Sequence, residues 1–237
     1  MVQLTQNHPY ITLRLKFKKV GSLQYISHLD LVRTMHKIVT RASLPLWYTE
    51  GFNPKPKLIF AAPLSIGTES VCEYMDVKLV DDIPPEEAMR RLNANMTDEM
   101  QILDAYYTET KPTDLKWLSY RITVKTDGAS QDMADKCNAL FASECIEVAK
   151  KAKAGEEPKI VNIKPQIHSA VAQYDSEEDK LVIDATLSSD SSAFLNPEYV
   201  VKALRRYVGI LSAEDITREY WTIMRLYAYR EDMTPFK

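Results

Sequence analysis

The chain has 237 residues, of which 45% are hydrophobic and 27% charged, so it can form one large or two small globular domains with a real core. No apolar run approaches the roughly 18–20 residues that a membrane span requires, and the first residues lack the basic and apolar regions of a secretory signal. The three cysteines have no C-x-x-C spacing, which argues against a disulfide framework and against a zinc or iron–sulfur site. We therefore expect a cytoplasmic protein with reduced thiols, no membrane contact and no cofactor of its own.

The net charge of −3 hides an asymmetry along the chain. Residues 1–60 carry nine Lys and Arg against two acids, a net charge of +7, which leaves −10 for residues 61–237. A basic segment on an acidic body favours a localised anionic partner. The alternative is that charge differs between the two parts by chance.

The first predicted elements are a strand over residues 11–20 and a helix from about residue 28 to residue 43. The strand alternates strictly, which gives it one apolar face and one cationic outer face, the latter made of Thr12, Arg14, Lys16 and Lys18. At the start of the helix, Ser27 is the expected N-cap, and Asp30 follows three residues later in a capping-box arrangement.

Alternation and turn residues predict the rest of the first half. Further strands are expected over residues 44–48, 57–62, 73–80 and 100–110. Prolines and acids open a helix over residues 85–96, and residues 111–114 are typical of a linker. Without the short strand over 44–48, the element order is β-α-β-β-α-β.

The same pattern recurs in the second half. Helices are expected over 131–142 and 197–207, an irregular passage over 152–165, and strands over 120–126, 146–151, 167–174, 180–187 and 220–229. We therefore predict an α+β fold of two tandem ferredoxin-like (βαββαβ) modules with mainly antiparallel sheets, covering residues 1–110 and 115–237. A single α+β domain with an elaborate sheet is the alternative.

The first helix carries the features that point to function. His28 and Asp30 lie in its first turn, where free backbone N–H groups and the helix dipole favour an anion such as a phosphate or a carboxylate. Ser27 and Asp30 could instead only cap the helix. Basic residues at helical spacing share one face, which suits a phosphate backbone or is simply solvated: Arg33, His36, Lys37 and Arg41.

The loop over residues 48–56 is predicted to be a rigid, presented binding loop, because Gly51 permits positive φ and Pro54 and Pro56 restrict its exit. Aromatic residues near it suit unpaired bases. Glu69 and Glu73 could pair with Arg33 or Lys55, or could be a loop charge and a strand edge. The candidate binding residues are Tyr25, Ser27, His28, Asp30, Arg33, Lys37, Tyr48, Gly51, Phe52, Asn53, Pro54, Lys55, Glu69, Glu73 and Tyr74.

These residues also carry a family resemblance. The S-H-L-D run at 27–30, the T-E-G-F-N-P-K-P run at 49–56 and the Glu73-Tyr74 pair resemble the radical-SAM-linked protein family, a domain of unknown function. The match is dense over about residues 10–110. Lys55 stands where the family commonly has His, and Thr49 where Ser is usual, which makes Lys55 a less certain site residue.

The resemblance implies a bacterial protein encoded beside, or fused to, a cobalamin-binding radical SAM enzyme. The present chain lacks the C-x-x-x-C-x-x-C motif of such an enzyme. It would therefore be the companion, and the iron–sulfur cluster, S-adenosylmethionine and cobalamin would belong to the partner.

Three hypotheses follow. The leading one is an accessory protein that presents an RNA, for instance ribosomal RNA, to a radical SAM partner. The second is a metal-independent endoribonuclease, with His28 as its general acid or base. The third is a protein–protein adaptor that docks through the Gly51–Pro56 loop. The sequence contains none of the P-loop, G-x-G-x-x-G, H-E-x-x-H or G-x-S-x-G motifs, so a standalone nucleotide-driven or hydrolytic enzyme has little support.

Overall fold

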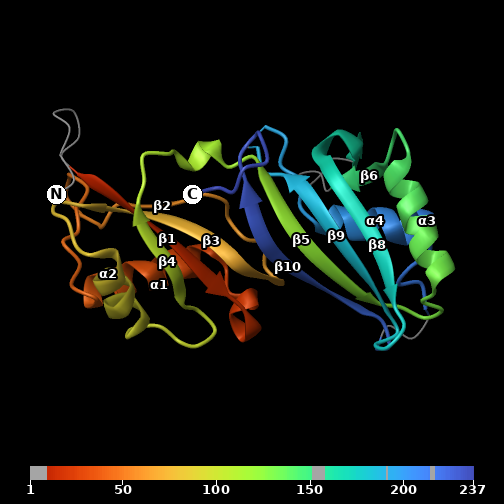
Figure 1. Ribbon diagram of the computed structural model, residues 1–237, viewed down its shortest axis with the longest axis horizontal. Coiled ribbons are helices and arrows are strands. Elements are labelled where there is room, and N and C mark those ends of the chain that lie inside the picture. Colours follow the sequence, from red (N-terminus) through yellow and green to blue (C-terminus); the bar gives the residue numbers. More distant parts are fainter. Residues whose placement is uncertain (1–9, 151–157, 191, 214–216) are drawn as a thin grey trace. The chain divides into compact units, whose positions relative to one another are not determined.

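The computed structural model describes residues 10–150, 158–190, 192–213 and 217–237. The chain forms two compact units (Figure 1). Unit 1 comprises the chain up to Leu115 together with Pro235–Lys237, and unit 2 comprises Lys116–Thr234. Each strand pairing within a unit is antiparallel, which confirms the predicted mixed α+β class with mainly antiparallel sheets. The last three residues join unit 1, although the sequence placed them in the second module.

The described residues of unit 1 form four strands, two α-helices and two short 3₁₀ turns. In chain order they are β1 (Ile11–Lys19), η1 (Gly21–Tyr25), α1 (His28–Arg41), β2 (Leu58–Phe60), β3 (Thr68–Leu79), α2 (Pro85–Asn93), β4 (Ile102–Tyr107) and η2 (Pro112–Asp114). Strand β1 lies between β4 and β3, and β2 pairs with the other edge of β3. The strand order is therefore β4-β1-β3-β2.

The core of unit 1 lies between one face of this sheet and the two helices. The apolar stripe of α1 is buried there, namely Leu31, Met35, Ile38 and Val39. It packs with alternate residues of β1 and β3, such as Leu15 and Val77, and with Leu92 of α2. The apolar residues of α1, spaced at the helical period of 3.6, and those of β1, spaced at every second position, are therefore buried in the same core.

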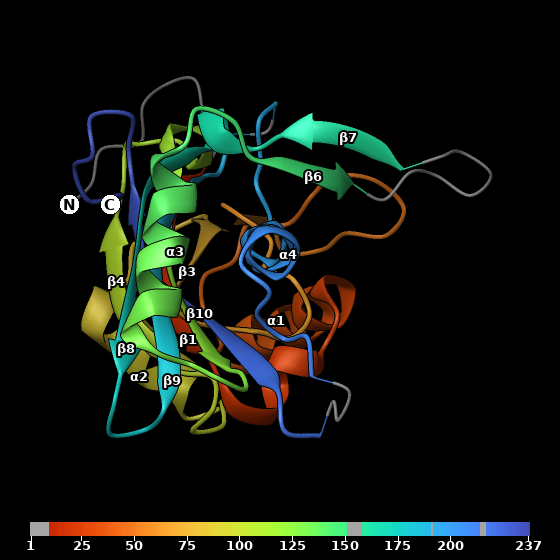
Figure 2. The ribbon, with the colours of Figure 1, turned by 90° about the vertical axis from the view of Figure 1, so that its right-hand side faces the viewer.

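Unit 2 repeats this arrangement. Its elements are β5 (Trp117–Lys125), α3 (Gln131–Ala142), β6 (Glu147–Lys150), β7 (Lys159–Asn162), η3 (Lys164–Gln166), β8 (Ile167–Asp175), β9 (Lys180–Ser188), α4 (Glu198–Tyr207) and β10 (Tyr220–Tyr229). Its main strands have the order β10-β5-β9-β8 in the sheet. With β5, β8, β9 and β10 counted as the first to fourth strands, this is the same order, fourth-first-third-second, as β4-β1-β3-β2 in unit 1. The β6–β7 hairpin is an addition after α3. Figure 2 shows α3 and α4 on the same side of this sheet.

Several predicted bounds differ from the structure. Residues 44–48 form two isolated bridges, Leu46 to Leu79 and Tyr48 to Pro56, in place of a strand. Pro45 lacks the N–H that a continuous ladder would need there. Strand β3 begins at Thr68, five residues before the predicted start at residue 73. Strand β7 lies in the passage predicted as irregular, and Lys151, the predicted end of the strand before it, lies outside the described residues.

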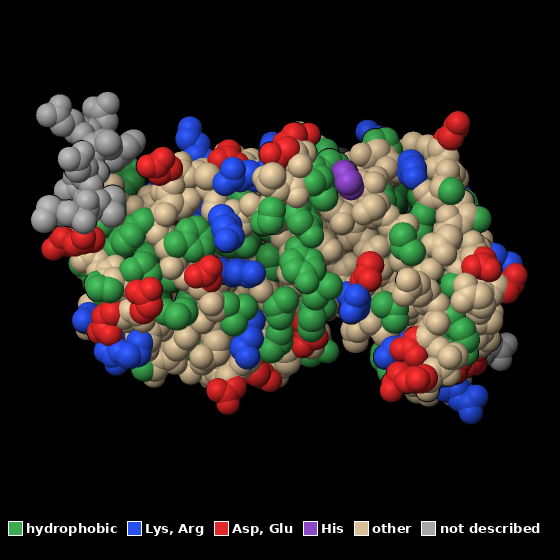
Figure 3. Space-filling view, viewed as in Figure 1, with side chains coloured by type: hydrophobic (Ala, Val, Ile, Leu, Met, Phe, Trp, Pro, Cys, Tyr) green, Lys and Arg blue, Asp and Glu red, His purple; other side chains and the backbone are tan. Residues whose placement is uncertain are grey.

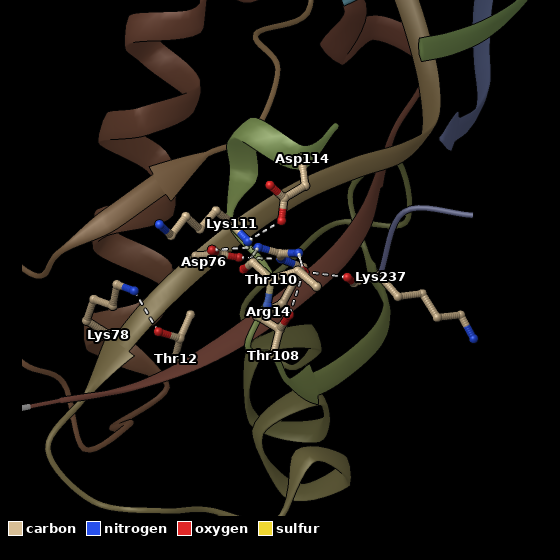
Figure 4. Close-up of polar contacts among 9 residues, drawn as sticks. All are labelled: Thr12, Arg14, Asp76, Lys78, Thr108, Thr110, Lys111, Asp114 and Lys237. Carbon is tan, nitrogen blue, oxygen red and sulfur yellow. Dashed lines mark hydrogen bonds and ion pairs between the residues drawn. The ribbon is translucent and has the colours of Figure 1, made fainter. Parts of the chain in front are cut away.

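The predicted cationic outer face of β1 is wrong for Arg14, whose side chain is completely buried. Its guanidinium donates to both carboxylate oxygens of Asp76 on β3, at 2.6 and 2.9 Å (Figure 4). It also donates to the hydroxyl and the carbonyl of Thr110, at 2.7 and 3.0 Å. The Phe236 ring lies 4.5 Å from the guanidinium carbon, and the Thr110 hydroxyl donates to the carbonyl of Lys237 at 2.6 Å. One buried cation therefore connects β1, β3, the segment after β4 and residues 236–237.

We predict that Arg14→Ala destabilises unit 1 by about 3–5 kcal/mol, because it leaves the Asp76 carboxylate buried and unpaired. Trp47 is in unit 1, whereas Trp117 and Trp221 are in unit 2. Urea unfolding followed by fluorescence, in a background with both unit 2 tryptophans changed to Phe, therefore reports on unit 1. Arg33→Ala, which removes a solvent-exposed partner, is the control and should leave the midpoint almost unchanged. Equal midpoints for both variants would contradict the role given to Arg14.

Candidate nucleic-acid interface

Side chains of the first turn of α1 form hydrogen bonds with one another and with the backbone of that turn. The Ser27 hydroxyl accepts the Asp30 backbone N–H at 3.1 Å and donates to the Asp30 carboxylate at 2.7 Å. The same carboxylate accepts a hydrogen bond from Arg33 at 3.1 Å. The Ser27 hydrogen bond, and then that of Arg33, lower the pKa of Asp30 below its ordinary value. Ser27 therefore caps the helix, and the Asp30 carboxylate holds the Ser27 hydroxyl and pairs with Arg33.

The Arg33–Asp30 pair is solvent-exposed, with 64% and 56% of the two side chains accessible. Exposed pairs of this kind are weak, because water screens the attraction and two long side chains must be ordered. Arg33 can consequently exchange Asp30 for an incoming phosphate at little cost. The alternative pairing of Glu69 with Arg33 is not observed in the described residues, where Arg33 pairs with Asp30 and Glu69 accepts the Gly21 N–H.

His28 is held against the sheet. Its ring meets the ring of Phe60 on β2 edge-on, with centroids 5.3 Å apart, and Phe60 in turn meets Phe17 at 6.4 Å. The His28 Nδ1 atom is buried and has no hydrogen-bond partner among the described residues. The imidazole thus has a packing role through Phe60, while one of its nitrogens stays unengaged.

The loop between Trp47 and Lys57 has a fixed stem and an exposed tip. The Thr49 N–H donates to the Lys55 carbonyl at 2.9 Å, the Lys55 N–H donates to the Thr49 hydroxyl at 3.2 Å, and the Lys57 N–H donates to the Trp47 carbonyl at 3.1 Å. Residues 50–55 are all exposed, including Asn53 and Pro54. Gly51 has φ +120°, a conformation that favours glycine. The expected presentation of this loop is therefore observed.

Phe52 at the tip of the loop is fully exposed, at 112% of the reference accessibility. Burying a large aromatic ring against a ligand is favourable, because it removes apolar surface from water. A ring held at the tip of a loop with a fixed stem is therefore suited to contact a ligand. Tyr48 at the base of the loop is 44% exposed. Two aromatic rings are thus available on this loop.

Lys55 of the loop lies within electrostatic reach of His36 on α1. Burial lowers the pKa of His36 on α1, and the positive charge of Lys55 in the loop lowers it further. Arg33, one helical turn before His36, and Lys37, directly after it, are both exposed. We call this combination the α1 surface and define it by Arg33, His36, Lys37, Tyr48, Phe52 and Lys55. Cations beside exposed rings are the combination that binds unpaired nucleotides.

Three sequence-predicted residues lie away from the α1 surface. Glu69 accepts a hydrogen bond from the Gly21 backbone N–H at 2.6 Å and so holds the start of η1. Glu73 and Tyr74 on β3 are buried, with 3% and 8% of the residue accessible, and the Tyr74 ring meets Phe236 edge-on at 5.0 Å. Burial strongly raises the pKa of Tyr74. These side chains brace unit 1 instead of facing a ligand at its surface.

Sequence reasoning missed a second exposed group on unit 1. Tyr25, Leu29 and Ile66 are 68%, 57% and 57% exposed. The Gly67 N–H donates to the Gln24 carbonyl at 2.9 Å and ties the loop before β3 to η1. Tyr25 alone was among the candidates. Leu29 lies between His28 and Asp30, and its exposure follows from its position on the solvent side of α1.

We predict that Lys55→Ala raises the pKa of His36 towards the ordinary imidazole value, because the nearby positive charge that disfavours protonation is lost. The pKa would be measured by following the histidine ring protons in an NMR pH titration. Lys57→Ala removes an equal charge two residues away and is the control. A His36 pKa that stays the same in Lys55→Ala would show that the loop does not lie beside α1.

Within the described residues, no helix combines the length and apolar character that crossing a bilayer requires. The same part of the chain has no group of three or more His, Cys, Asp or Glu side chains that could hold a metal ion.

Comparison with solved structures gives weak similarities. A chain of a Cbf5–Nop10–Gar1 complex matches with a TM-score of 0.49 and 11% identity over 95% of the present chain, which spans 51% of that chain. An unknown protein from Galdieria sulphuraria matches with a TM-score of 0.27 and 11% identity, covering 91% of this chain and 98% of that one. An anthrone oxidase-like protein gives a TM-score of 0.25 and 10% identity over 94% and 93% of the two chains. Similarities at this level indicate neither the fold nor the function.

A search among curated proteins gave no match to the sequence. Residues 12–197 match a bacterial family described as "Uncharacterized protein conserved in bacteria (DUF2344)". The matched region includes β1, the whole α1 surface and most of unit 2. The chain therefore belongs to the DUF2344 family.

Proposed function

We propose that this chain is an accessory RNA-binding protein of the cytoplasm that presents a single-stranded segment of RNA to a radical SAM enzyme. The observation that supports RNA binding is the fully exposed Phe52 ring on a braced loop beside the cations of α1. The radical SAM partner is supported by the resemblance in the residues of α1 and this loop. In this proposal the cluster, S-adenosylmethionine and cobalamin belong to the partner.

The α1 surface suits single-stranded RNA better than a duplex. Its cations provide the sequence-independent attraction to phosphates that dominates affinity for nucleic acids. The exposed rings of Phe52 and Tyr48 provide stacking faces, which bases offer only when they are unpaired. Ordering costs are small because the stem hydrogen bonds already fix the loop.

The two units share one strand order, which supports the proposal that both are ferredoxin-like modules. We interpret both as ferredoxin-like modules, because each has the β-α-β-β-α-β order once β6 and β7 are set aside in unit 2. In each, the first and third strands of the series are central, and the fourth and second strands flank them. In such a module the helices cover one face of the sheet, and the loops and the other face are available for binding.

We predict that Arg33→Ala with Lys37→Ala weakens binding of a labelled 15-nucleotide single-stranded RNA and flattens its salt dependence. Each lost phosphate contact should reduce the slope of log affinity against log salt by roughly 0.7. The control, Arg90→Ala with Lys136→Ala, removes the same charge from exposed ion pairs on α2 and α3. Fluorescence anisotropy at several salt concentrations measures both. A slope that the first variant leaves unchanged would rule out the α1 surface as the phosphate contact.

We further predict that affinity purification of the tagged chain from its native bacterium recovers a radical SAM protein by mass spectrometry. Recovery of the radical SAM protein both with and without ribonuclease would mean that the two proteins contact each other directly. Recovery only without ribonuclease would mean that RNA bridges the two proteins. An α1-surface variant that keeps the partner but loses RNA separates the two functions. If no radical SAM protein is recovered in either condition, the partner part of the proposal fails.

A further inference from the structure

The sheet of unit 2 has one face that its helices leave open. Alternate residues of β5 and β9 are buried, among them Ile122, Val124, Ile183 and Leu187, and α3 and α4 lie on that side (Figure 2). The intervening residues point to the opposite side. Arg121 and Asp184, which are register partners on neighbouring strands, are exposed there at 52% and 51% of their side chains.

Aromatic residues gather at one end of this open face. Tyr227 and Tyr229 lie two apart on β10, beyond the irregularity in the β10–β5 register, so their side chains share a side of the sheet. Their register partners on β5 are Ser119 and Trp117. The Tyr227 side chain is among the exposed large hydrophobics, at 58%. Figure 3 shows hydrophobic side chains gathered over β10 on the face turned to the viewer.

The rings form two contacting pairs. The centroids of Tyr227 and Tyr229 are 6.3 Å apart, with an angle of 41° between the ring planes. Trp117 on β5 meets His168 on β8 at 5.2 Å. Because Tyr229 and Trp117 are register partners, the two pairs lie side by side on the open face. We call them the aromatic face: Trp117, His168, Tyr227 and Tyr229.

The charges around the aromatic face are balanced. Arg121 donates two hydrogen bonds to Asp184, at 2.8 and 2.9 Å, and Lys125 pairs with Asp179 at 3.0 Å. Neighbouring positions on the open side carry polar groups such as Ser119 and Gln173, together with Val171, which is 53% exposed. The face therefore combines rings with hydrogen-bonding groups, and the cations among these described residues are paired.

We infer that the aromatic face binds the unpaired bases of a single-stranded nucleic acid by stacking. It thereby extends the proposed function, on which it rests for the class of ligand, from unit 1 to unit 2. Each base offers a ring face to Tyr227 or Trp117, and hydroxyl and amide groups nearby can reach base edges.

The composition of the aromatic face distinguishes this occupant from others. A duplex keeps its bases stacked on one another, so it would offer no base face to the exposed Tyr227 ring. A protein partner or a second copy would bury the face as a whole, and the Arg121–Asp184 pair at its centre, now half exposed, would lose its water at a cost in free energy. Rings flanked by polar groups match the stacking platforms that several RNA-binding sheets use.

Stacking and phosphate attraction have different signatures, which makes the inference testable on the full chain. Tyr227→Ala should weaken binding of the same 15-nucleotide single-stranded RNA by on the order of five- to a hundredfold, the range for one base–aromatic stack. The slope of affinity against salt should stay that of the wild type, because no cation is removed. Tyr227→Phe keeps the ring and should bind almost as well as the wild type.

The matched control is Tyr207→Ala, which removes a tyrosine of 46% exposure from α4 in the same unit. Circular dichroism melting checks that each variant is folded. As a second readout, RNA containing 4-thiouridine is crosslinked by light, and the attached peptides are mapped by mass spectrometry. Crosslinks to the peptides of β10 or β5 are expected.

The outcomes separate this inference from the proposed function. If Tyr227→Ala binds like the wild type and crosslinks map only to unit 1, the aromatic face is not an RNA site, and the α1 surface stands. If Tyr227→Ala weakens binding while the Arg33/Lys37 variant does not, the aromatic face stands and the α1 surface falls. A wild-type chain that does not bind the RNA overturns both. A change from dimer to monomer in Tyr227→Ala, without an effect on RNA, would assign the face to a second copy and overturn the inference.

Discussion

The buried Arg14–Asp76 pair is the interaction on which unit 1 depends most. A guanidinium without any exposed surface must have its donors satisfied inside the protein, and here a carboxylate and Thr110 supply the acceptors. The bidentate geometry also sets the register, since Arg14 and Asp76 are opposite each other on β1 and β3. The pair thus fixes which side of β1 faces α1 and consequently where the α1 surface lies.

One-sided sheets explain where the candidate binding groups are found. In both units the helices pack against one face, so that apolar residues are concentrated there. The remaining binding groups then lie on the outer side of a helix, on loops such as 48–56, or on the open face of a sheet. The α1 surface uses the first two positions, and the aromatic face uses the third. The two surfaces differ in chemistry. The α1 surface has the exposed Lys37 and Lys55, for which the described residues show no ion pair, whereas Arg121 and Lys125 beside the aromatic face are each paired with an acid.

The sequence predicts the local features of this protein well. The bounds of α3 and β10, the Ser27 cap and the apolar stripe of α1 all follow from neighbouring residues, and the structure has them. The exposed tip of the loop around Gly51 also follows from neighbouring residues, and the structure has it. Local patterns carry these features because hydrogen bonds and faces repeat within a few residues.

Features that depend on distant partners were not predictable in this way. Alternation places Arg14 on the outside of β1, but its burial depends on Asp76, 62 residues further along the chain. Strand β7 exists through its pairing with β6 across the residues between them. The aromatic face joins Trp117, His168 and Tyr229 from three strands, and in the sequence each looks like an ordinary strand residue.

The path of the chain through unit 1 has a consequence for how the protein folds during synthesis. The chain leaves unit 1 after Leu115 and returns at Pro235, so all of unit 2 is made before Phe236 emerges from the ribosome. Until then, the Arg14 guanidinium lacks the aromatic ring that covers it, and Thr110 lacks the Lys237 carbonyl. The surroundings of Arg14 can therefore be completed only after the whole of unit 2 has been synthesised.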